Sequence, residues 1–182
     1  MTGLTVVTPQ SRENAAEREE YSVYSALISE QFVRDNTRLV IITDPTCCHL
    51  SQLTKKNPEV LQQLAPVSQD TVRDFADRNR EEQHLRREFT LAVAYRIVDY
   101  AKIEKLFAPM ILDEEWKTFY RLYPRSNGYL RLSRVGFNKD RNEALVETAW
   151  MRGERYGEGK YFLLSKVGGK WRVQRSAGTW MA

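Results

Sequence analysis

Residues able to act on one another chemically are concentrated in one short segment, Asp44-Pro45-Thr46-Cys47-Cys48-His49. A cysteine becomes a nucleophile when a nearby base lowers the pKa of its thiol, and His49 follows Cys47 closely. The segment comes after an apolar run, and loops at strand ends commonly carry catalytic side chains. Asp44, Cys47 and His49 are therefore the candidate residues of a thiol-dependent enzyme.

The same segment has a non-catalytic interpretation. Cys47 and Cys48 are the only cysteines in the chain, and neighbouring cysteines cannot build the disulfide framework of a small secreted domain. With one nearby histidine they fall short of the four ligands of a structural zinc site, unless His84 or distant carboxylates complete it. We interpret them as free, buried thiols beside a surface histidine. We expect no metal and no cofactor, and we favour a protein without catalytic activity.

Glu147 lies in the middle of the predicted strand over residues 143–151, among mostly apolar side chains. In this strand, Glu147 points away from the face that carries Trp150. A buried carboxylate needs a partner, and Arg134 on the preceding predicted strand is the expected one. Two charged and three aromatic side chains are the candidate ligand-binding residues: Tyr120, Arg134, Glu147, Trp150 and Tyr156.

Other carboxylates occur in groups at Glu19-Glu20, Glu81-Glu82 and Asp113-Glu114-Glu115. All fall on predicted helix surfaces or first turns, where solvation and the helix dipole favour acidic side chains. The sequence contains no glycine-rich phosphate loop, nucleophile elbow or metal-binding helix motif. These carboxylates therefore predict no active site.

The positive charge of the chain belongs to its C-terminal third. The net charge is +4, but from residue 118 onward there are 13 Lys and Arg against 5 Asp and Glu, and aromatic residues lie among them. Cations interleaved with stacking rings are the ingredients of a nucleic-acid surface. Three functions therefore remain open. The first is a non-catalytic binding or interaction domain for a small molecule or a protein, the second is a nucleic-acid-binding domain, and the third is the thiol enzyme.

The elements that position these residues alternate between helical and strand-like patterns. Tyr21, Tyr24, Ile28 and Phe32 recur at helical spacing within residues 12–33. The remaining N-terminal elements are predicted as strands 38–43 and 89–98 and helices 49–64, 69–83, 101–107 and 113–122. Ser68 or Asp70 is a suitable N-cap for the helix that starts at 69.

After Asn127 the pattern changes to short strands joined by turns. Strands are expected over residues 129–138, 143–151, 160–167 and 170–175, with a glycine-bearing loop over 152–159 and a bulge near Ser133–Arg134. Consecutive strands on short turns pair antiparallel. The sequence therefore predicts an α+β domain over residues 12–182, after a flexible arm over 1–11. N-terminal helices plus a strand precede a four-stranded antiparallel meander, with helices on one face of the sheet.

Composition limits where in the cell the chain is expected to be found. Hydrophobic residues make up 42% of 182 residues, and no apolar run approaches the ~20 residues that span a bilayer. We expect no membrane span. Without a leader-like pattern the chain is cytoplasmic if Met1 is the native start, and the alternative is an exported chain whose leader has been removed.

Three motifs carry a resemblance to a known family. They read Trp116-x-x-Phe119-Tyr120-x-x-Tyr123-Pro124, Leu132-Ser133-Arg134-Val135-Gly136-Phe137-Asn138, and Tyr161-x-Leu163-Leu164-x-Lys166-x-x-Gly169-Lys170-Trp171. Together they resemble a family of uncharacterised bacterial proteins. Its members look exported, with glycines and cysteines between the second and third C-terminal strands, whereas this chain has only the glycines there. The resemblance implies a shared fold and brings no activity.

Overall fold

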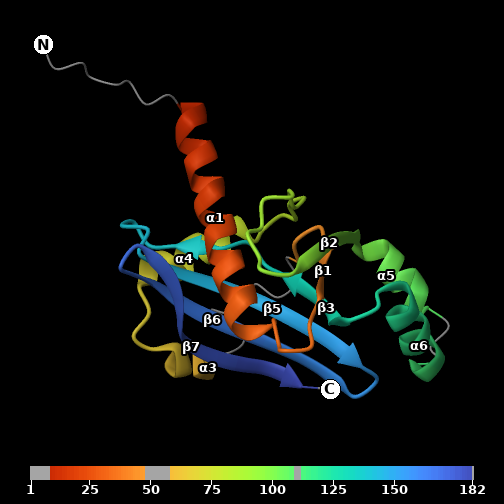
Figure 1. The fold of residues 1–182 in the computed structure, drawn as a ribbon. Coiled ribbons are helices and arrows are strands. Elements are labelled where there is room, and N and C mark those ends of the chain that lie inside the picture. The colour runs from red at the N-terminus through yellow and green to blue at the C-terminus, as the bar shows by residue number, and fades with distance from the viewer. Residues whose placement is uncertain (1–8, 48–57, 109–111, 182) are drawn as a thin grey trace, which may run out of the picture.

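A computed structural model describes residues 9–47, 58–108 and 112–181 (Figure 1). The chain has an α+β fold built on one mixed sheet of seven strands. The helices are α1 (Pro9–Gln31), α3 (Pro58–Leu64), α4 (Gln69–Arg78), α5 (Tyr100–Phe107) and α6 (Leu112–Leu122). The strands are β1 (Leu39–Asp44), β2 (Ala94–Asp99), β3 (Ser126–Leu132), β4 (Gly136–Phe137), β5 (Glu143–Gly153), β6 (Tyr156–Val167) and β7 (Lys170–Met181).

The strands lie in the order β2-β1-β3-β5-β6-β7, and β4 pairs with β5. β1 runs parallel to both β2 and β3, whereas the pairs from β3 onward are antiparallel. The predicted α+β class is confirmed, but a strict four-stranded meander is wrong. Parallel neighbours require a long crossover, and the chain between β1 and β2 is long enough to supply one. The C-terminal strands are thereby continuous with two strands from the N-terminal half.

The predicted strand over residues 129–138 is divided in two. β3 ends at Leu132 and β4 begins at Gly136. Between them the Ser133 N–H donates to the Glu147 carbonyl oxygen at 2.9 Å, and the Glu147 N–H donates to Ser133 Oγ at 2.8 Å. The bulge predicted near Ser133–Arg134 therefore coincides with the place where the chain leaves the regular strand pairing.

One face of the sheet is covered by the segment that contains Phe89 and, among the described helices, by α1 (Figure 1). Its predicted apolar stripe is confirmed, because Tyr21, Tyr24, Ile28 and Phe32 are all buried. Phe32 packs edge-on against the Trp150 ring with the ring centres 5.3 Å apart. The stripe meets side chains from five strands: Val40, Ile42, Leu130, Leu132, Phe137, Ala144, Val146, Trp150, Phe162 and Leu164.

The opposite face carries two separate apolar clusters. One packs α3 and α4 against β5, β6 and β7, through Val60, Leu64, Phe75, Leu145, Tyr161, Leu163 and Ala177. The other packs α5 and α6 against β1, β2 and β3, through Ile41, Val98, Ile103, Trp116, Phe119 and Tyr129. Helices therefore cover both faces, where the sequence predicted helices on one.

Several boundaries differ from those predicted. α1 already begins at Pro9, and the rest of the expected arm lies outside the described residues. α4 has Ser68 as N-cap, one of the two residues predicted, and it ends at Arg78, where Asn79 is the C-cap and its side-chain amide donates to the Phe75 carbonyl oxygen. β2 starts only at Ala94. None of the described helices is both long and apolar enough to cross a membrane.

The glycine-bearing loop predicted over residues 152–159 is mostly strand. β5 runs to Gly153 and β6 resumes at Tyr156, so the hairpin turn is tight. A Cβ on Gly159 would collide with the Trp180 ring and with Thr179 Oγ1. A glycine is required there because the Trp180 ring lies across the strand, and this close approach is the physical reason for the wrong prediction.

Candidate functional site

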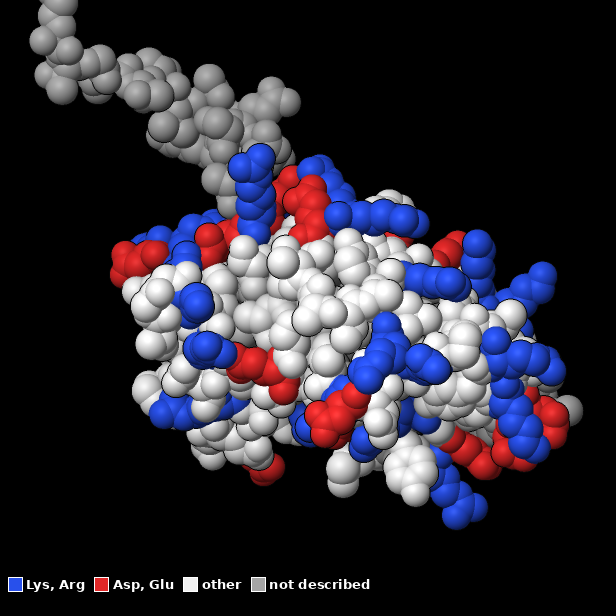
Figure 2. Space-filling view, in the orientation of Figure 1, with Lys and Arg blue, Asp and Glu red and all other residues white. Residues whose placement is uncertain are grey.

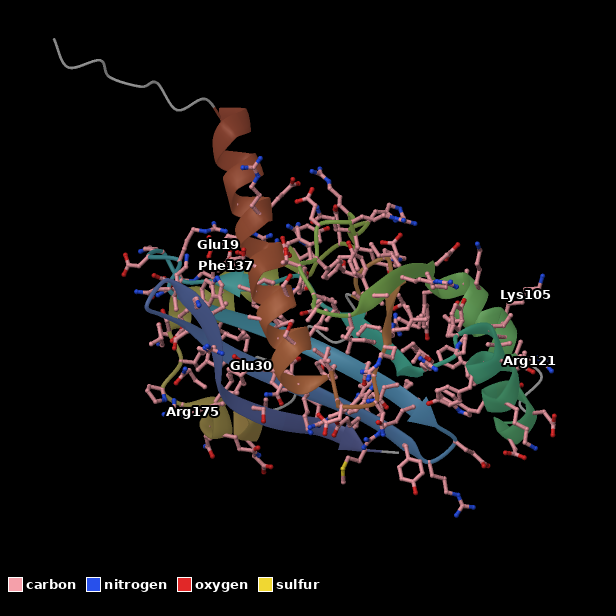
Figure 3. The ribbon with its side chains drawn as sticks, in the orientation of Figure 1. Glu19, Glu30, Lys105, Arg121, Phe137 and Arg175 are labelled. Atoms are coloured by element: carbon pink, nitrogen blue, oxygen red, sulfur yellow. The ribbon has the colours of Figure 1, made fainter. Side chains whose placement is uncertain are left out.

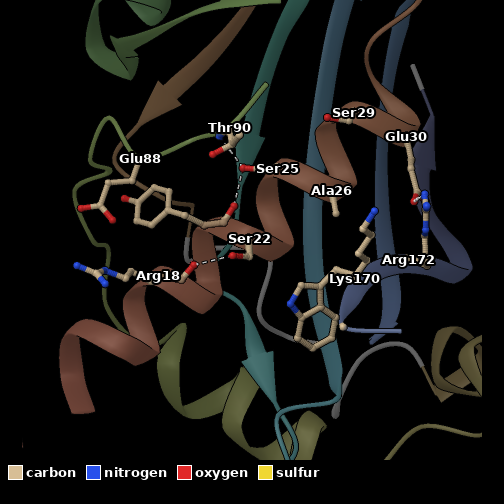
Figure 4. Close-up of a pocket in the computed structure, with 13 residues that line it drawn as sticks. Arg18, Ser22, Ser25, Ala26, Ser29, Glu30, Glu88, Thr90, Lys170 and Arg172 are labelled. Atoms are coloured by element: carbon tan, nitrogen blue, oxygen red, sulfur yellow. Dashed lines mark hydrogen bonds and ion pairs between the residues drawn. The ribbon is translucent and has the colours of Figure 1, made fainter. Parts of the chain in front are cut away.

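The outer side of α1 forms the floor of a groove of about 650 Å³ (Figure 4). Small side chains make up this floor: Ser22, Ser25, Ala26 and Ser29. Residues three and four apart lie on the same side of a helix, so these short side chains form one continuous depression along the helix surface. The hollow therefore follows from the spacing of small residues in α1.

Two segments distant in sequence form the walls (Figure 4). One is the segment before β2, with Glu88 and Thr90, and the other is the β6–β7 turn with residues 169–172. The Thr90 N–H donates to Ser25 Oγ at 2.9 Å, and Ser25 Oγ donates to the Tyr21 carbonyl oxygen at 2.7 Å. These bonds fix the first wall to the helix.

The second wall is held by two carboxylates of α1, Glu19 and Glu30 (Figure 3). Glu30 accepts from Arg172 Nη1 and from the Val173 N–H, both at 3.1 Å. Glu19 Oε1 accepts from the indole N–H of Trp171 at 2.6 Å. Both carboxylates are thus engaged by β7, so they contribute little free negative charge to the groove.

The cations left in the groove are Arg18 and Lys170. Within the described ranges, neither side chain has a carboxylate oxygen within 4 Å. The remaining acid, Glu88, lies 3.9 Å from Arg86 Nη1. Figure 2 shows uncharged surface over the middle of this face, with both basic and acidic side chains around it. The groove consequently offers positive charge and serine hydroxyls to a ligand.

A buried ion-pair network secures α1 close to the groove. The Glu20 carboxylate, 5% exposed, accepts from Arg78 Nη2 at 2.5 Å, from Arg134 Nη2 at 3.0 Å and from the Val135 N–H at 3.0 Å. The Tyr24 hydroxyl lies 3.0 Å from Glu20 Oε1, and burial raises its pKa well above the usual value. The prediction that Glu20 is solvated is therefore wrong. It joins α1, α4 and the segment between β3 and β4.

The predicted partnership of Glu147 with Arg134 is also wrong. Arg134 pairs with Glu20 because the chain between β3 and β4 leaves the ladder and faces α1. Glu147, 1% exposed, lies on the opposite face beside Tyr161, its direct neighbour on β6. Burial raises the pKa of Glu147 to about 8, and the hydrogen bond from Tyr161 partly opposes this rise. The β5–β6 register pairs Tyr161 with Glu147, and a hairpin alignment of the sequence would have identified this pair.

The predicted thiol-enzyme residues are spread over different environments. Asp44 binds His84, whose Nδ1 lies 2.9 Å from Asp44 Oδ2, and this hydrogen bond raises the pKa of His84. The His84 side chain is 85% exposed. Cys47 is buried and lies close enough to Tyr161 to affect its pKa. His49 lies outside the described residues. The structure therefore brings Cys47 near the Tyr161–Glu147 pair, while Asp44 faces another histidine.

The predicted aromatic candidates gather around a residue that was not among them, Arg152. Its guanidinium lies 4.4 Å from the centre of the Trp150 ring and 5.9 Å from that of Tyr156. The Tyr120 hydroxyl donates to the Arg152 carbonyl oxygen at 2.7 Å. Trp150 is itself buried, and Tyr156 is 65% exposed. This set, here called the Arg152 cluster, forms a second surface at the end of the sheet that carries the β5–β6 turn.

The described residues form an α+β fold with an open, polar groove beside helix α1. No protein-family model, curated protein or solved structure matches the chain. In the described part of the chain, no group of three or more His, Cys, Asp or Glu side chains is placed to hold a metal.

Proposed function

We propose that the chain is a non-catalytic binding domain, and that the groove along α1 is where it binds. The observation that carries this proposal is a groove whose small-residue floor and two walls are fixed by hydrogen bonds, with Arg18 and Lys170 left without described carboxylate partners. A volume of about 650 Å³ falls in the range of small-molecule sites. The ligand class is a small polar molecule that carries a carboxylate or a phosphate.

The groove chemistry favours binding over catalysis. Its described lining contains no histidine or cysteine, which are the usual bases and nucleophiles. Ser22 Oγ donates to the Arg18 carbonyl oxygen at 3.0 Å, and Ser25 is engaged by Tyr21 and Thr90. These hydroxyls are oriented by the helix backbone rather than by a general base, so they are suited to accept hydrogen bonds from a ligand.

The test is titration with a panel of small anions followed by NMR. Citrate, glutamate, glucuronate and glucose 6-phosphate supply carboxylates or phosphates with different numbers of hydroxyls. Binding in the groove shifts the backbone resonances of Ser22, Ala26 and Gly169. Shifts confined to other parts of the chain would contradict the proposed site.

A charge-reversed pair of variants supplies the control. Lys170→Glu removes a groove cation and should weaken binding about tenfold, which corresponds to ~1.4 kcal/mol. Arg175→Glu changes the same charge on the same strand, outside the groove lining, and should leave the affinity unchanged. Equal losses in both variants would show attraction to the overall charge rather than a groove.

A second function, nucleic-acid binding, is favoured by the Arg152 cluster. The Arg38 N–H donates to the Arg125 carbonyl oxygen at 3.1 Å, so two more arginines lie at the start of β3. A Cβ on Gly128 of β3 would collide with the backbone of Arg152, so β3 runs close beside the cluster. An exposed tyrosine among arginines is a platform for stacking a base.

Single-stranded oligonucleotides of mixed sequence test this second function. Three or four phosphate contacts give a slope of about −2 to −3 in log K against log salt, since each contributes ~−0.7 for a single strand. Tyr156→Ala should remove one stacking contact and weaken binding about fivefold or more. Binding that is independent of salt, or unchanged in Tyr156→Ala, would remove the Arg152 cluster from consideration.

A further inference from the structure

The two edges of the sheet are built differently. β7 forms one edge, and its ladder with β6 is interrupted twice, between Gly159 and Lys160 and between Leu163 and Leu164. The interruptions leave Thr179 and Gln174 as extra residues on β7. Such bulges are a common protection of an edge strand against pairing with another chain. β7 is therefore an edge that resists the addition of a further strand.

β2 forms the other edge and has no such protection (Figure 1). Its register with β1 is unbroken over six residues, from Leu39 opposite Ala94 to Asp44 opposite Asp99. It contains no proline, and its only charged side chains are Arg96 and Asp99. Among the described strands only β1 pairs with β2, so its outer side presents backbone N–H and C=O groups ready to pair.

A groove of about 740 Å³ runs along this edge. All six residues of β2 line it, and they are joined by Arg87, Val93, Lys102 and Tyr123. The groove therefore extends along the whole length of β2 and is not a local hollow beside one side chain. An extended segment is the shape that can fill such a groove and satisfy the outer side of the strand at the same time.

The charge of the groove identifies the occupant. Three cations line it, Arg87, Arg96 and Lys102, and Asp99 is the only carboxylate among the described residues of its lining. Asp99 Oδ1 already accepts from the Ala101 N–H at 2.9 Å, where it caps α5. None of the three cations has a described carboxylate oxygen within 4 Å. A second copy of the chain would bring the same excess of cations to the contact, whereas an acidic segment complements it.

We propose that β2 is a docking edge that takes up an extended, acidic segment of a partner protein as an additional strand. Backbone hydrogen bonds to β2 hold the segment, and Arg87, Arg96 and Lys102 select acidic side chains along it. This inference is independent of the groove along α1, which lies on a different set of residues.

The probe is a synthetic ten-residue peptide in which Glu alternates with Val, labelled for fluorescence anisotropy. Two further peptides carry N-methyl groups on alternate residues, one on the even and one on the odd positions. In an added strand only alternate N–H groups face β2. One methylated peptide should bind like the parent and the other at least tenfold more weakly. Equal affinities of the two would overturn strand addition.

A matched pair of variants on α5 tests the charge selection. Lys102→Glu reverses a cation in the groove and should weaken the parent peptide about tenfold. Lys105→Glu reverses an exposed cation on the same helix, outside the groove, and should leave binding unchanged. Hydrogen exchange provides an independent readout, because alternate amides of β2 should gain protection when the peptide binds. Protection at β7 instead, self-association through β2, or displacement of the peptide by an oligonucleotide would each overturn the proposal.

Discussion

Glu147→Gln should make the chain more stable at neutral and alkaline pH, by an amount that depends on pH. Glu147 is buried, and its Oε2 has no hydrogen-bond partner within the described structure. Its pKa is raised from 4.5 to about 8. The folded protein therefore keeps this proton over a pH range in which the unfolded chain has released it. Stability from this group is fully present below pH 4.5 and is lost as the pH rises toward 8.

The magnitude follows from the two pKa values. A pKa difference of one unit corresponds to about 1.4 kcal/mol. Between pH 4 and pH 7 the stability of the native chain should fall relative to Glu147→Gln by about 3 kcal/mol, and by pH 9 by about 5 kcal/mol. The amide of the glutamine also changes the free energy of unfolding, but by the same amount at every pH. The informative quantity is therefore how the difference in unfolding free energy between the native chain and Glu147→Gln changes with pH.

Urea unfolding followed by tryptophan fluorescence at pH 4, 7 and 9 measures this difference. Leu145→Ala is the matched control, because it is buried on the same strand and face and loses about 2–5 kcal/mol equally at every pH. Tyr161→Phe removes the hydrogen bond that lowers the pKa of Glu147. In this variant the free energy of unfolding should therefore continue to fall to a higher pH than in the native chain. A stability difference between native chain and Glu147→Gln that stays constant from pH 4 to 9 would refute the reasoning.

Three further predictions use the same unfolding assay. Glu20→Gln leaves two partly buried arginines without their carboxylate, so a loss of about 3–5 kcal/mol is expected, and a loss under 1 kcal/mol would show that water reaches the network. Gly159→Ala should lower the free energy of unfolding by about 1–3 kcal/mol, because the new methyl group collides with Trp180. Gly178→Ala is the control: no described atom lies within 4 Å of the added Cβ, so stability should change by less than about 0.5 kcal/mol. Ser68→Ala should cost about 1 kcal/mol through loss of the α4 cap.

Local patterns in the sequence were enough to place most of the elements. The apolar run of residues 38–43 became β1 with a shift of one residue, and the turn at Gly168-Gly169 fixed the start of β7. The apolar run and the glycine turn each depend only on residues adjacent in sequence, so the sequence was enough to predict both. β6 extends beyond the predicted strand because Gly157 and Gly159 were interpreted as part of a loop, although both glycines make room for neighbouring side chains.

The errors arose where the outcome depends on residues far apart in the chain. Glu20 is buried only because Arg78 and Arg134 approach it from two other elements. Phe89 was predicted to begin a strand, but its ring packs on Tyr21 with centres 5.1 Å apart, and β2 starts later. No local pattern contains these distant contacts.

The candidate groove was partly visible in the sequence. Ser22, Ser25, Ala26 and Ser29 have the helical spacing of a small-residue face, which could have been noticed beside the apolar stripe. The walls could not have been predicted, since nothing local places Thr90 and Lys170 on either side of α1. The quoted family motifs point elsewhere, because Trp116, Phe119, Leu132 and Val135 are buried in the core. The residues that carry the resemblance therefore serve the packing of the fold.

The division of one sheet face into two clusters has a consequence for how the molecule opens. Two apolar clusters lie on this face, one under α5 and α6 and one under α3 and α4, and they share no described side chain. Each pair of helices can therefore detach without exposing the side chains buried under the other pair. β3 and β5 join the two halves in the middle of the sheet. Heating should therefore release the halves as separate cooperative units, and the β3 and β5 amides should be the last to exchange.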